Sequence, residues 1–516
     1  MRELAGASRR RALRIIGGLG AAGALTAVAG GLETSPPVGD DLSPSEPVSR
    51  SAVSPVVREN ARAGAAAFRL RGPRRANEAT GQLAGYADRT SVAVGEEITF
   101  HVSVAPAQDY QISVYRLGHY GGAGARLVAS SPWLAGQTQA PPAVDPTTRL
   151  VRCAWSPGWR LRIPRDQVSG YHLALLRSAA GVHWWIPFVV RNPAPCSAGL
   201  VVIPTSTYQA YNRWPADGRT GASLYYGYDA TGRWVNAARA RAVSHDRPYG
   251  GGGLPGQAVG DVAFVRWAEE QGYDLTYATS EDLHTGRVVP HQHRVVVFAG
   301  HDEYWSAEMR AAVTTARDRG TSLVFLAPNN CYWRIRYEAG DRTVECAKSH
   351  RRKGHPAPPT CRWRIADSPE QKLIGVQYVS VVDGVAPLVV RTSGHWFWAD
   401  AGVADGDEIR GLVWGEADQL MPGVPEPAAV ERSLLADSPF THAGRAYRQH
   451  THLYQAHSGA WVFAAGTFGW TRALRDPAGP GTSPGDPRIQ QATRNLLDRL
   501  FVGAGPTTAP AADPSS

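Results

Sequence analysis

Three short segments of the sequence contain most of the side chains that could do chemistry. Each is rich in tyrosine, tryptophan and polar residues, and each directly follows an apolar run typical of a buried strand. The segments comprise residues 204–214, 300–306 and 327–334. In an open parallel sheet, ligands bind beyond the carboxyl ends of the strands. We therefore expect the three segments to meet at one site.

The second segment contains His301 and Glu303, separated by one residue at a predicted strand-to-helix turn. A carboxylate and an imidazole so placed can supply a metal ligand together with a general base or an orienting group. The alternative is that Asp302 and Glu303 only cap the helix that begins near Ser306. Three strand-end segments of the same character favour function over capping.

The third segment contains Asn329 and Asn330, which could orient a substrate amide or simply form a turn. Cys331 follows them, and we expect it to pack in the core rather than to act as a nucleophile. Histidine and cysteine spacing argues against a zinc site, because the sequence has neither a His-x-x-x-His nor a Cys-x-x-Cys pattern.

The elements expected to position these residues form an α/β domain. Apolar runs at residues 200–203, 274–277, 295–298 and 322–326 alternate with helical patterns that include residues 306–319. Continuous apolar strands alternating with helices predict a parallel sheet covered on both faces, of the doubly wound kind. A strand at residues 461–465 and a helix at residues 489–501 are expected to close the domain.

An earlier part of the chain has a different rhythm. Short runs at residues 97–104, 111–115, 171–175 and 185–190 alternate apolar and polar side chains, with turn residues between them. This period of two predicts a small β-sandwich, similar to an immunoglobulin or fibronectin module. Two domains are also what a chain of 516 residues requires, since it is too long for one hydrophobic core.

The first residues have the order of a secretory signal. Arg9 and Arg10 follow a serine and precede an apolar, Gly- and Ala-rich run at residues 15–32. Paired arginines before a moderately apolar run indicate a twin-arginine signal peptide, whereas a retained membrane anchor is the weaker alternative. We expect the mature protein to be secreted or associated with the cell envelope, without stable membrane insertion.

These patterns divide the chain into five regions. We expect a signal peptide, a disordered linker, a β-sandwich domain, an α/β catalytic domain and a disordered tail, at residues 1–32, 33–78, 79–193, 194–503 and 504–516.

Charge and cysteine content limit the remaining function classes. The net charge of +9 is spread over the signal and separate loops, which favours solubility over a nucleic-acid-binding stripe. Five cysteines in an exported chain permit disulfides. We expect a local bridge between Cys346 and Cys361 first, and one between Cys153 and Cys196 second.

Taken together, several motifs resemble one known family. They include Val-Ile-Pro-Thr-Ser-Thr-Tyr-Gln-Ala-Tyr-Asn at residues 202–212, Asp-Arg-Pro-Tyr at residues 246–249, Gly-His-Asp-Glu-Tyr-Trp at residues 300–305 and Asn-Asn-Cys-Tyr-Trp-Arg at residues 329–334. This set is similar to the large chain of N,N-dimethylformamidase and its relatives. The similarity extends from about Gly85 to Phe501.

The resemblance implies a mononuclear, ferric iron held by two tyrosinates and one glutamate, in a sheet resembling the glutamine amidotransferase fold. By motif, it makes Tyr208, Tyr249 and Glu303 the ligands, with Tyr211 as the rival to Tyr208. His301 and Asn329 become groups beside the metal or in contact with substrate. Phenolate and carboxylate oxygens are hard donors that suit ferric iron.

The resemblance also implies Glu416 as an additional acid or base. The leading hypothesis is therefore an exported, iron-dependent amidohydrolase that cleaves the C–N bond of a small or linear amide, with His301 assisting water and Asn329 orienting the carbonyl. A separate small subunit and a homo-oligomer both remain compatible with the sequence. The rival hypothesis is a noncatalytic exported protein that binds cell-surface carbohydrate through its aromatic loops.

Overall fold

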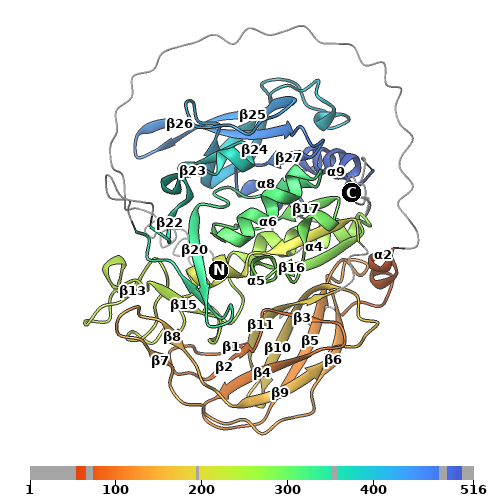
Figure 1. Ribbon diagram of the computed structural model, residues 1–516. Coiled ribbons are helices and arrows are strands. Elements are labelled where there is room, and N and C mark those ends of the chain that lie inside the picture. Colours follow the sequence, from red (N-terminus) through yellow and green to blue (C-terminus); the bar gives the residue numbers. More distant parts are fainter. Residues whose placement is uncertain (1–53, 66–73, 193–196, 350–357, 476–484, 503–516) are drawn as a thin grey trace, which may run out of the picture. The chain divides into compact units, whose positions relative to one another are not determined.

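The computed structural model describes residues 54–65, 74–192, 197–349, 358–475 and 485–502 (Figure 1). These residues belong to one compact unit, Arg50–Ser516. The predicted signal peptide, the predicted tail and Cys196 lie outside the described residues. No helix in the described ranges is long and apolar enough to cross a membrane.

Part of the expected linker is helical. Helix α2 (Pro55–Asn60) begins at Ser54, whose side chain accepts a hydrogen bond from the Val56 amide. The buried Glu59 of this helix accepts hydrogen bonds from Tyr120 and Arg126 of the following domain. The segment therefore packs against the folded chain through buried polar contacts that its Pro- and Ala-rich composition did not indicate.

The first domain contains two sheets with a shared core, one antiparallel and one mixed, in which β1 and β3 pair parallel with β11. One sheet has the order β1 (Arg74–Arg75), β11 (Val182–Arg191), β10 (Gly170–Ser178), β5 (Tyr110–Leu117) and β6 (Ala125–Ser130), with β3 (Ser91–Ala93) also paired to β11. The other has the order β2 (Leu83–Ala87), β4 (Glu97–Val104) and β9 (Pro157–Arg162). A short pair, β7 (Ala143–Val144) and β8 (Val151–Arg152), lies beyond them. Fully buried rings, such as those of Phe100 and Trp184, fill the space between the sheets.

The second domain is built on a seven-stranded sheet. Its order is β16 (Leu275–Thr279), β12 (Gly199–Ile203), β17 (Val295–Phe298), β19 (Ser322–Phe325), β27 (Trp461–Ala464), β26 (Arg445–Gln455) and β25 (Glu431–His442). The first five strands are parallel and the last two pair antiparallel. In chain order the parallel strands run 2-1-3-4-5, which is a doubly wound order and confirms the predicted parallel sheet.

Helices cover both faces of this sheet, because alternate strand residues belong to different cores. Val201 packs in the cluster that includes residues of α4 (Ala258–Glu270) and α9 (Pro487–Val502). Val202 packs in the cluster that includes residues of α6 (Ala307–Asp318). Strands buried on both sides explain the continuous apolar runs in the sequence.

Smaller elements surround the carboxyl ends of the parallel strands. They are α3 (Thr205–Tyr211), β13 (Gly227–Tyr228), β14 (Trp234–Val235), β15 (Ala242–Ser244), α5 (Ser280–His284), β18 (Tyr304–Ser306), β20 (Trp333–Glu338), β21 (Thr343–Glu345), β22 (Cys361–Arg362), α7 (Gln371–Ile374), α8 (Gly469–Ala473), and the hairpin of β23 (Gln377–Val389) and β24 (Glu408–Gln419). Short 3-10 turns are η2 (Asn236–Ala238), η3 (Pro290–Gln292), η4 (Trp363–Ala366) and η5 (Trp396–Trp398).

Two buried carboxylates join the domains. Glu269 on α4 forms an ion pair of 2.8 Å with Arg116 of β5, and neither side chain is exposed. Glu281 on α5 accepts a hydrogen bond of 2.7 Å from Thr90, which lies between β2 and β3. The sandwich is therefore connected to the elements around the parallel sheet by specific polar contacts.

The expected disulfide between Cys346 and Cys361 is not formed. Both residues are buried free thiols, as are Cys153 and Cys331. Burial raises the pKa of the Cys346 and Cys331 thiols to about 12, which makes them unreactive near neutral pH. Cys331 packs in the apolar core, as expected.

Candidate active site

The three strand-end segments meet where the order of the parallel strands reverses. The chain leaves β12 for β16 on one side and later returns to β17 on the other, so the loops after β12 and β17 diverge. Ligands bind at such a switch point in doubly wound sheets. Helix α3 follows β12, His301 and Glu303 follow β17, and Asn329 follows β19.

Glu303 is the centre of this site. Its Oε2 accepts a hydrogen bond of 2.6 Å from the Tyr211 hydroxyl, and its Oε1 accepts one of 2.6 Å from the Tyr225 hydroxyl. The two tyrosine rings stack with centroids 4.6 Å apart, and their hydroxyl groups lie 3.0 Å from each other. Two phenols and one buried carboxylate thus place their oxygens together.

Local backbone contacts explain this geometry. The amide of Glu303 donates a hydrogen bond of 3.0 Å to the Thr207 hydroxyl on α3. Tyr211 is the last residue of the same helix, so α3 holds both the backbone of Glu303 and one of its phenol partners. The helix beginning after Ser306 is capped by Ser306 itself, whose hydroxyl accepts from the Met309 amide. Capping therefore does not account for Glu303.

Two of the tyrosines expected as ligands lie elsewhere. The Tyr208 hydroxyl donates a hydrogen bond of 2.7 Å to Asp261 on α4, and the Tyr249 ring packs edge-on against Tyr208 at 6.3 Å. Neither makes a described contact with Glu303. The two phenols that reach Glu303 are therefore Tyr211, the rival of Tyr208 in the sequence, and Tyr225 in place of Tyr249, whereas Tyr208 of the same helix contacts Asp261.

His301, Asn329 and Glu416 come together as expected. His301 Nε2 lies 3.4 Å from Glu303 Oε2 and 3.9 Å from Glu416 Oε2. Asn329 Nδ2 donates a hydrogen bond of 3.0 Å to Glu416 Oε2, and its backbone amide donates to Asp418. Asn329 has a left-handed φ of 57°, a conformation that asparagine tolerates better than most residues. The next residue, Asn330, accepts from the Asp302 amide and so ties the two loops together.

Burial and neighbouring charges shift the pKa values of three groups in this site. It raises the pKa of Glu416 to about 7, against the opposing charge of His301. Burial alone would lower the pKa of His301, but the hydrogen bond to Glu303 and the charges of both carboxylates raise it to about 9. Although burial acts in the opposite direction, contacts with His301 hold the pKa of Glu303 below its usual value. At neutral pH the site therefore contains a charged imidazole, a carboxylate and a second carboxyl close to its titration point.

Two residues of the site were not singled out from the sequence. Tyr225 lies in an irregular segment between α3 and β13. The sequence feature that could have pointed to it is the pair Tyr225-Tyr226, which stands between two glycines. Lys348 places Nζ 3.3 Å from the centroid of the Tyr225 ring and 4.8 Å from that of Trp333. Burial lowers the pKa of this lysine to about 8. No spacing rule predicts the position of a single lysine.

The donor set fits ferric iron by its chemistry. Phenol and carboxylate oxygens are hard donors, and the hydroxyl groups of Tyr211 and Tyr225 already converge on Glu303. Within the described ranges, no group of three or more His, Cys, Asp or Glu side chains is arranged to hold a metal ion.

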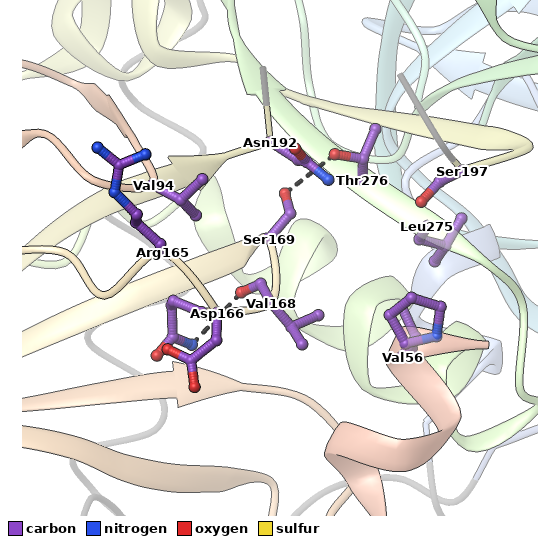
Figure 2. A pocket seen from close by; sticks show the side chains of 12 residues that line it. Val56, Val94, Arg165, Asp166, Val168, Ser169, Asn192, Ser197, Leu275 and Thr276 are labelled. Carbon is purple, nitrogen blue, oxygen red and sulfur yellow. Dashed lines mark hydrogen bonds between the residues drawn. The ribbon is translucent and has the colours of Figure 1, made fainter. Parts of the chain in front are cut away.

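A cavity of about 180 Å³ lies away from this site (Figure 2). Its wall includes Val56 of α2, Ser169 before β10, and Leu275 at the amino end of β16. Ser169 accepts a hydrogen bond of 3.1 Å from Thr276, so polar groups of this wall already have partners within the protein. Since the cavity adjoins the amino end of a parallel strand, it is separate from the switch point.

The fold and site define an α/β protein whose switch point combines two phenols, two carboxyl groups, an imidazole and an amide. The chain belongs to the N,N-dimethylformamidase family: residues 111–484 match the family described as "N,N-dimethylformamidase beta subunit-like, C-terminal". This match covers more than half of the chain and confirms the resemblance drawn from the motifs. The family is one of hydrolases that act on the C–N bond of amides, and its description names a subunit of a larger enzyme.

Other comparisons add nothing to this assignment. No curated protein matches the chain. Among solved structures, a superoxide reductase from Ignicoccus hospitalis is 11% identical, with 22% of this chain and 82% of that chain covered and a TM-score of 0.14. A cycloisomaltooligosaccharide glucanotransferase from Paenibacillus sp. is 10% identical, with 60% and 61% covered and a TM-score of 0.16. Scores this low carry no argument about fold or function.

Proposed function

We propose that this protein is an exported, iron-dependent amidohydrolase that cleaves the C–N bond of a small or linear amide. The observation that carries the proposal is the convergence of the Tyr211 and Tyr225 hydroxyl groups on the carboxylate of Glu303. In a protein of this family, a buried set of three hard oxygen donors at the switch point supports a metal centre.

Tyr211, Tyr225 and Glu303 would hold the iron. When bound, ferric iron would supply a Lewis acid beside the substrate carbonyl. The hydrogens that now lie between the phenols and Glu303 would leave with metal binding, because metal ligands must be deprotonated. Lys348 over the Tyr225 ring would favour the resulting negative charge of that phenolate.

Glu416 is the proposed general base and acid. With a pKa of about 7, it can accept a proton from water near neutral pH and return it to the departing amine. Asn329 fixes Glu416 Oε2 by its amide hydrogens. The other end of the Asn329 side chain, Oδ1, is buried without a partner in the described structure, so it is free to accept a hydrogen bond from a substrate amide or water.

We assign His301 an electrostatic role, in place of the expected assistance to water. Against the effect of burial, contacts with Glu303 and Glu416 raise the pKa of His301 to about 9, which favours the charged imidazole over a neutral base at neutral pH. The imidazole lies between Glu303 and Glu416, where its charge can stabilise a negative oxygen that develops on the carbonyl. The proton from water is therefore assigned to Glu416.

The remaining expectations form part of the same proposal. The two-sheet domain is proposed to be immunoglobulin-like and the parallel-sheet domain glutamine-amidotransferase-like. Export is proposed through the twin-arginine signal at Arg9 and Arg10, and a separate small subunit is a candidate partner because the family is named for one subunit.

Metal analysis of the purified protein tests the proposal. We expect close to one iron per chain and a visible tyrosinate-to-iron absorption band, together with hydrolysis of members of an amide panel. A colourless protein that takes up no iron after reconstitution would contradict the metal centre. Iron and colour without activity on any amide would contradict the hydrolase.

A further inference from the structure

Arg247 is a buried cation without a carboxylate partner. Its side chain is 1% exposed, and its nearer acceptors are the neutral backbone carbonyls of Trp214, Ala222 and Asn212, at 3.2, 2.9 and 3.2 Å. Gln209 Oε1 lies further away, at 3.4 Å. No carboxylate of the described residues forms an ion pair with it. A buried charge is costly unless an opposite charge compensates it, and burial lowers the pKa of Arg247 to about 10.

His245, two residues earlier, has an unused ring nitrogen. The residue is 3% exposed, and its Nε2 lies 3.1 Å from Glu281 Oε1. Its Nδ1 is buried and has no hydrogen-bond partner in the described structure. In the imidazolium form, Nδ1 would bear a hydrogen that needs an acceptor.

Glu281 does not supply a counter-charge to Arg247 or an acceptor to His245 Nδ1, because both of its carboxylate oxygens already have other partners. Thr90 and Thr205 donate to Oε2 at 2.7 and 2.5 Å, and Tyr337 donates to Oε1 at 2.8 Å. His245 Nδ1 therefore has no hydrogen-bond partner, and Arg247 has neutral acceptors but no counter-charge, among the described residues.

Both residues line the same small cavity between the domains. The cavity has a volume of about 20 Å³, enough for a single water-sized particle. Its wall consists of Gly85, Tyr86, Ala87, Arg89, Thr90, Ile186, Pro187, Gln209, His245, Arg247 and Tyr249. This wall contains three basic side chains and no carboxylate; Arg89, however, has acidic partners outside it, Asp88 and Glu96.

We propose that this cavity binds a monatomic anion of the size of chloride. A particle here is lined by the side chains of Arg89, His245 and Arg247 and by no carboxylate. An anion satisfies the charge of Arg247, which a water molecule does not. Since the wall combines residues of the sandwich with Gln209 of α3 and residues that follow β15, the anion stabilises the contact between the domains. The inference does not depend on iron or on catalysis.

The test measures thermal unfolding of the full chain while chloride is raised from about 1 to about 100 mM, with gluconate keeping the ionic strength constant. We expect chloride, and bromide likewise, to raise the unfolding midpoint of the wild-type protein by several degrees. His245→Gln retains an N–H for Glu281 but loses Nδ1, so its response should fall to less than half. His172→Gln, at a buried histidine of β10 away from the cavity, is the matched control and should keep the full response.

Equal stabilisation by chloride and gluconate in the wild-type protein would overturn the proposal, as would a full chloride response in His245→Gln. If that variant does not fold, crystals of the wild-type protein grown in bromide decide the question. An anomalous peak between His245 and Arg247 supports the site, and a water molecule in that position overturns it.

Discussion

Replacing Tyr225 with phenylalanine tests the ligand assignment most directly. The change removes one hydroxyl, which donates to both oxygens of Glu303 at 2.6 and 2.8 Å, and it leaves the ring in place. The stacking on Tyr211 and the contact with Lys348 are thereby retained. Any effect on the metal centre then comes from the phenol oxygen.

The size of the effect follows from the bond that is lost. A hydrogen bond to a charged group contributes about 1.5–3 kcal/mol, which corresponds to a factor of about 10–150 in an equilibrium constant. A metal–phenolate bond contributes at least as much as the hydrogen bond it replaces. We therefore expect Tyr225→Phe to weaken iron binding by at least about 10-fold and to shift or remove the visible absorption band.

The assay is titration of metal-free protein with a ferric chelate, followed by absorption spectroscopy and metal analysis. Tyr208→Phe is the matched control. It also removes a buried tyrosine hydroxyl, from helix α3, but that hydroxyl is bonded to Asp261 and not to Glu303. This variant should lose some thermal stability and keep both its iron affinity and its band. Loss of the band in Tyr208→Phe, with an unchanged band in Tyr225→Phe, would refute the assignment.

Three further predictions concern catalysis and stability. Glu416→Gln should keep its iron while kcat falls by about 10²–10⁴-fold, as measured on any amide that the wild-type protein hydrolyses; equal kcat values would exclude Glu416 as the base. Gly300→Ala should lower the free energy of unfolding by about 1–3 kcal/mol, because its Cβ would lie 2.2 Å from Asp261 Oδ2, whereas Gly394→Ala, with open space, should not change it. Burial lowers the pKa of His172 to about 3, so the neutral form is favoured on folding and stability is lost as pH falls from about 6.5 towards that value. The slope is about 1.4 kcal/mol per pH unit, and His172→Gln should reduce the acid dependence of the unfolding midpoint by this contribution.

The strand-end residues were predictable because topology places them. Once apolar runs alternate with helices, the segments after parallel strands must lie at one edge of the sheet. His301, Glu303 and Asn329 followed from that rule. Glu416 followed from family resemblance, since its hairpin, β23–β24, lies outside the parallel sheet.

The choice among tyrosines could not be made in the same way. Tyr208 and Tyr211 lie within one turn of a short helix, and motif similarity includes both. Which of them faces Glu303 depends on the rotation of α3 about its axis. That rotation is set by hydrogen bonds between the helix and other elements: from Thr205 to Glu281, from the Glu303 amide to Thr207, and from Tyr208 to Asp261. Tyr225 and Lys348 belong to irregular segments, for which periodicity gives no direction.

The cysteines show the same limit. Spacing made a bridge between Cys346 and Cys361 reasonable, but a disulfide needs a particular separation and orientation of both side chains. Both thiols are instead buried and free around β20.

By itself, the sequence determined the doubly wound sheet, the family, the location of the candidate site at the carboxyl ends of the parallel strands, and three of the polar groups at that site. It could do so because strand burial and chain order are local or topological properties. Only the tertiary structure decided that Tyr211 and Tyr225 are the phenols on Glu303, that the pKa values of Glu416 and His301 are both raised, and that Arg247 lacks a counter-charge among the described residues. These depend on distances between segments far apart in the chain, which packing sets and no local pattern records.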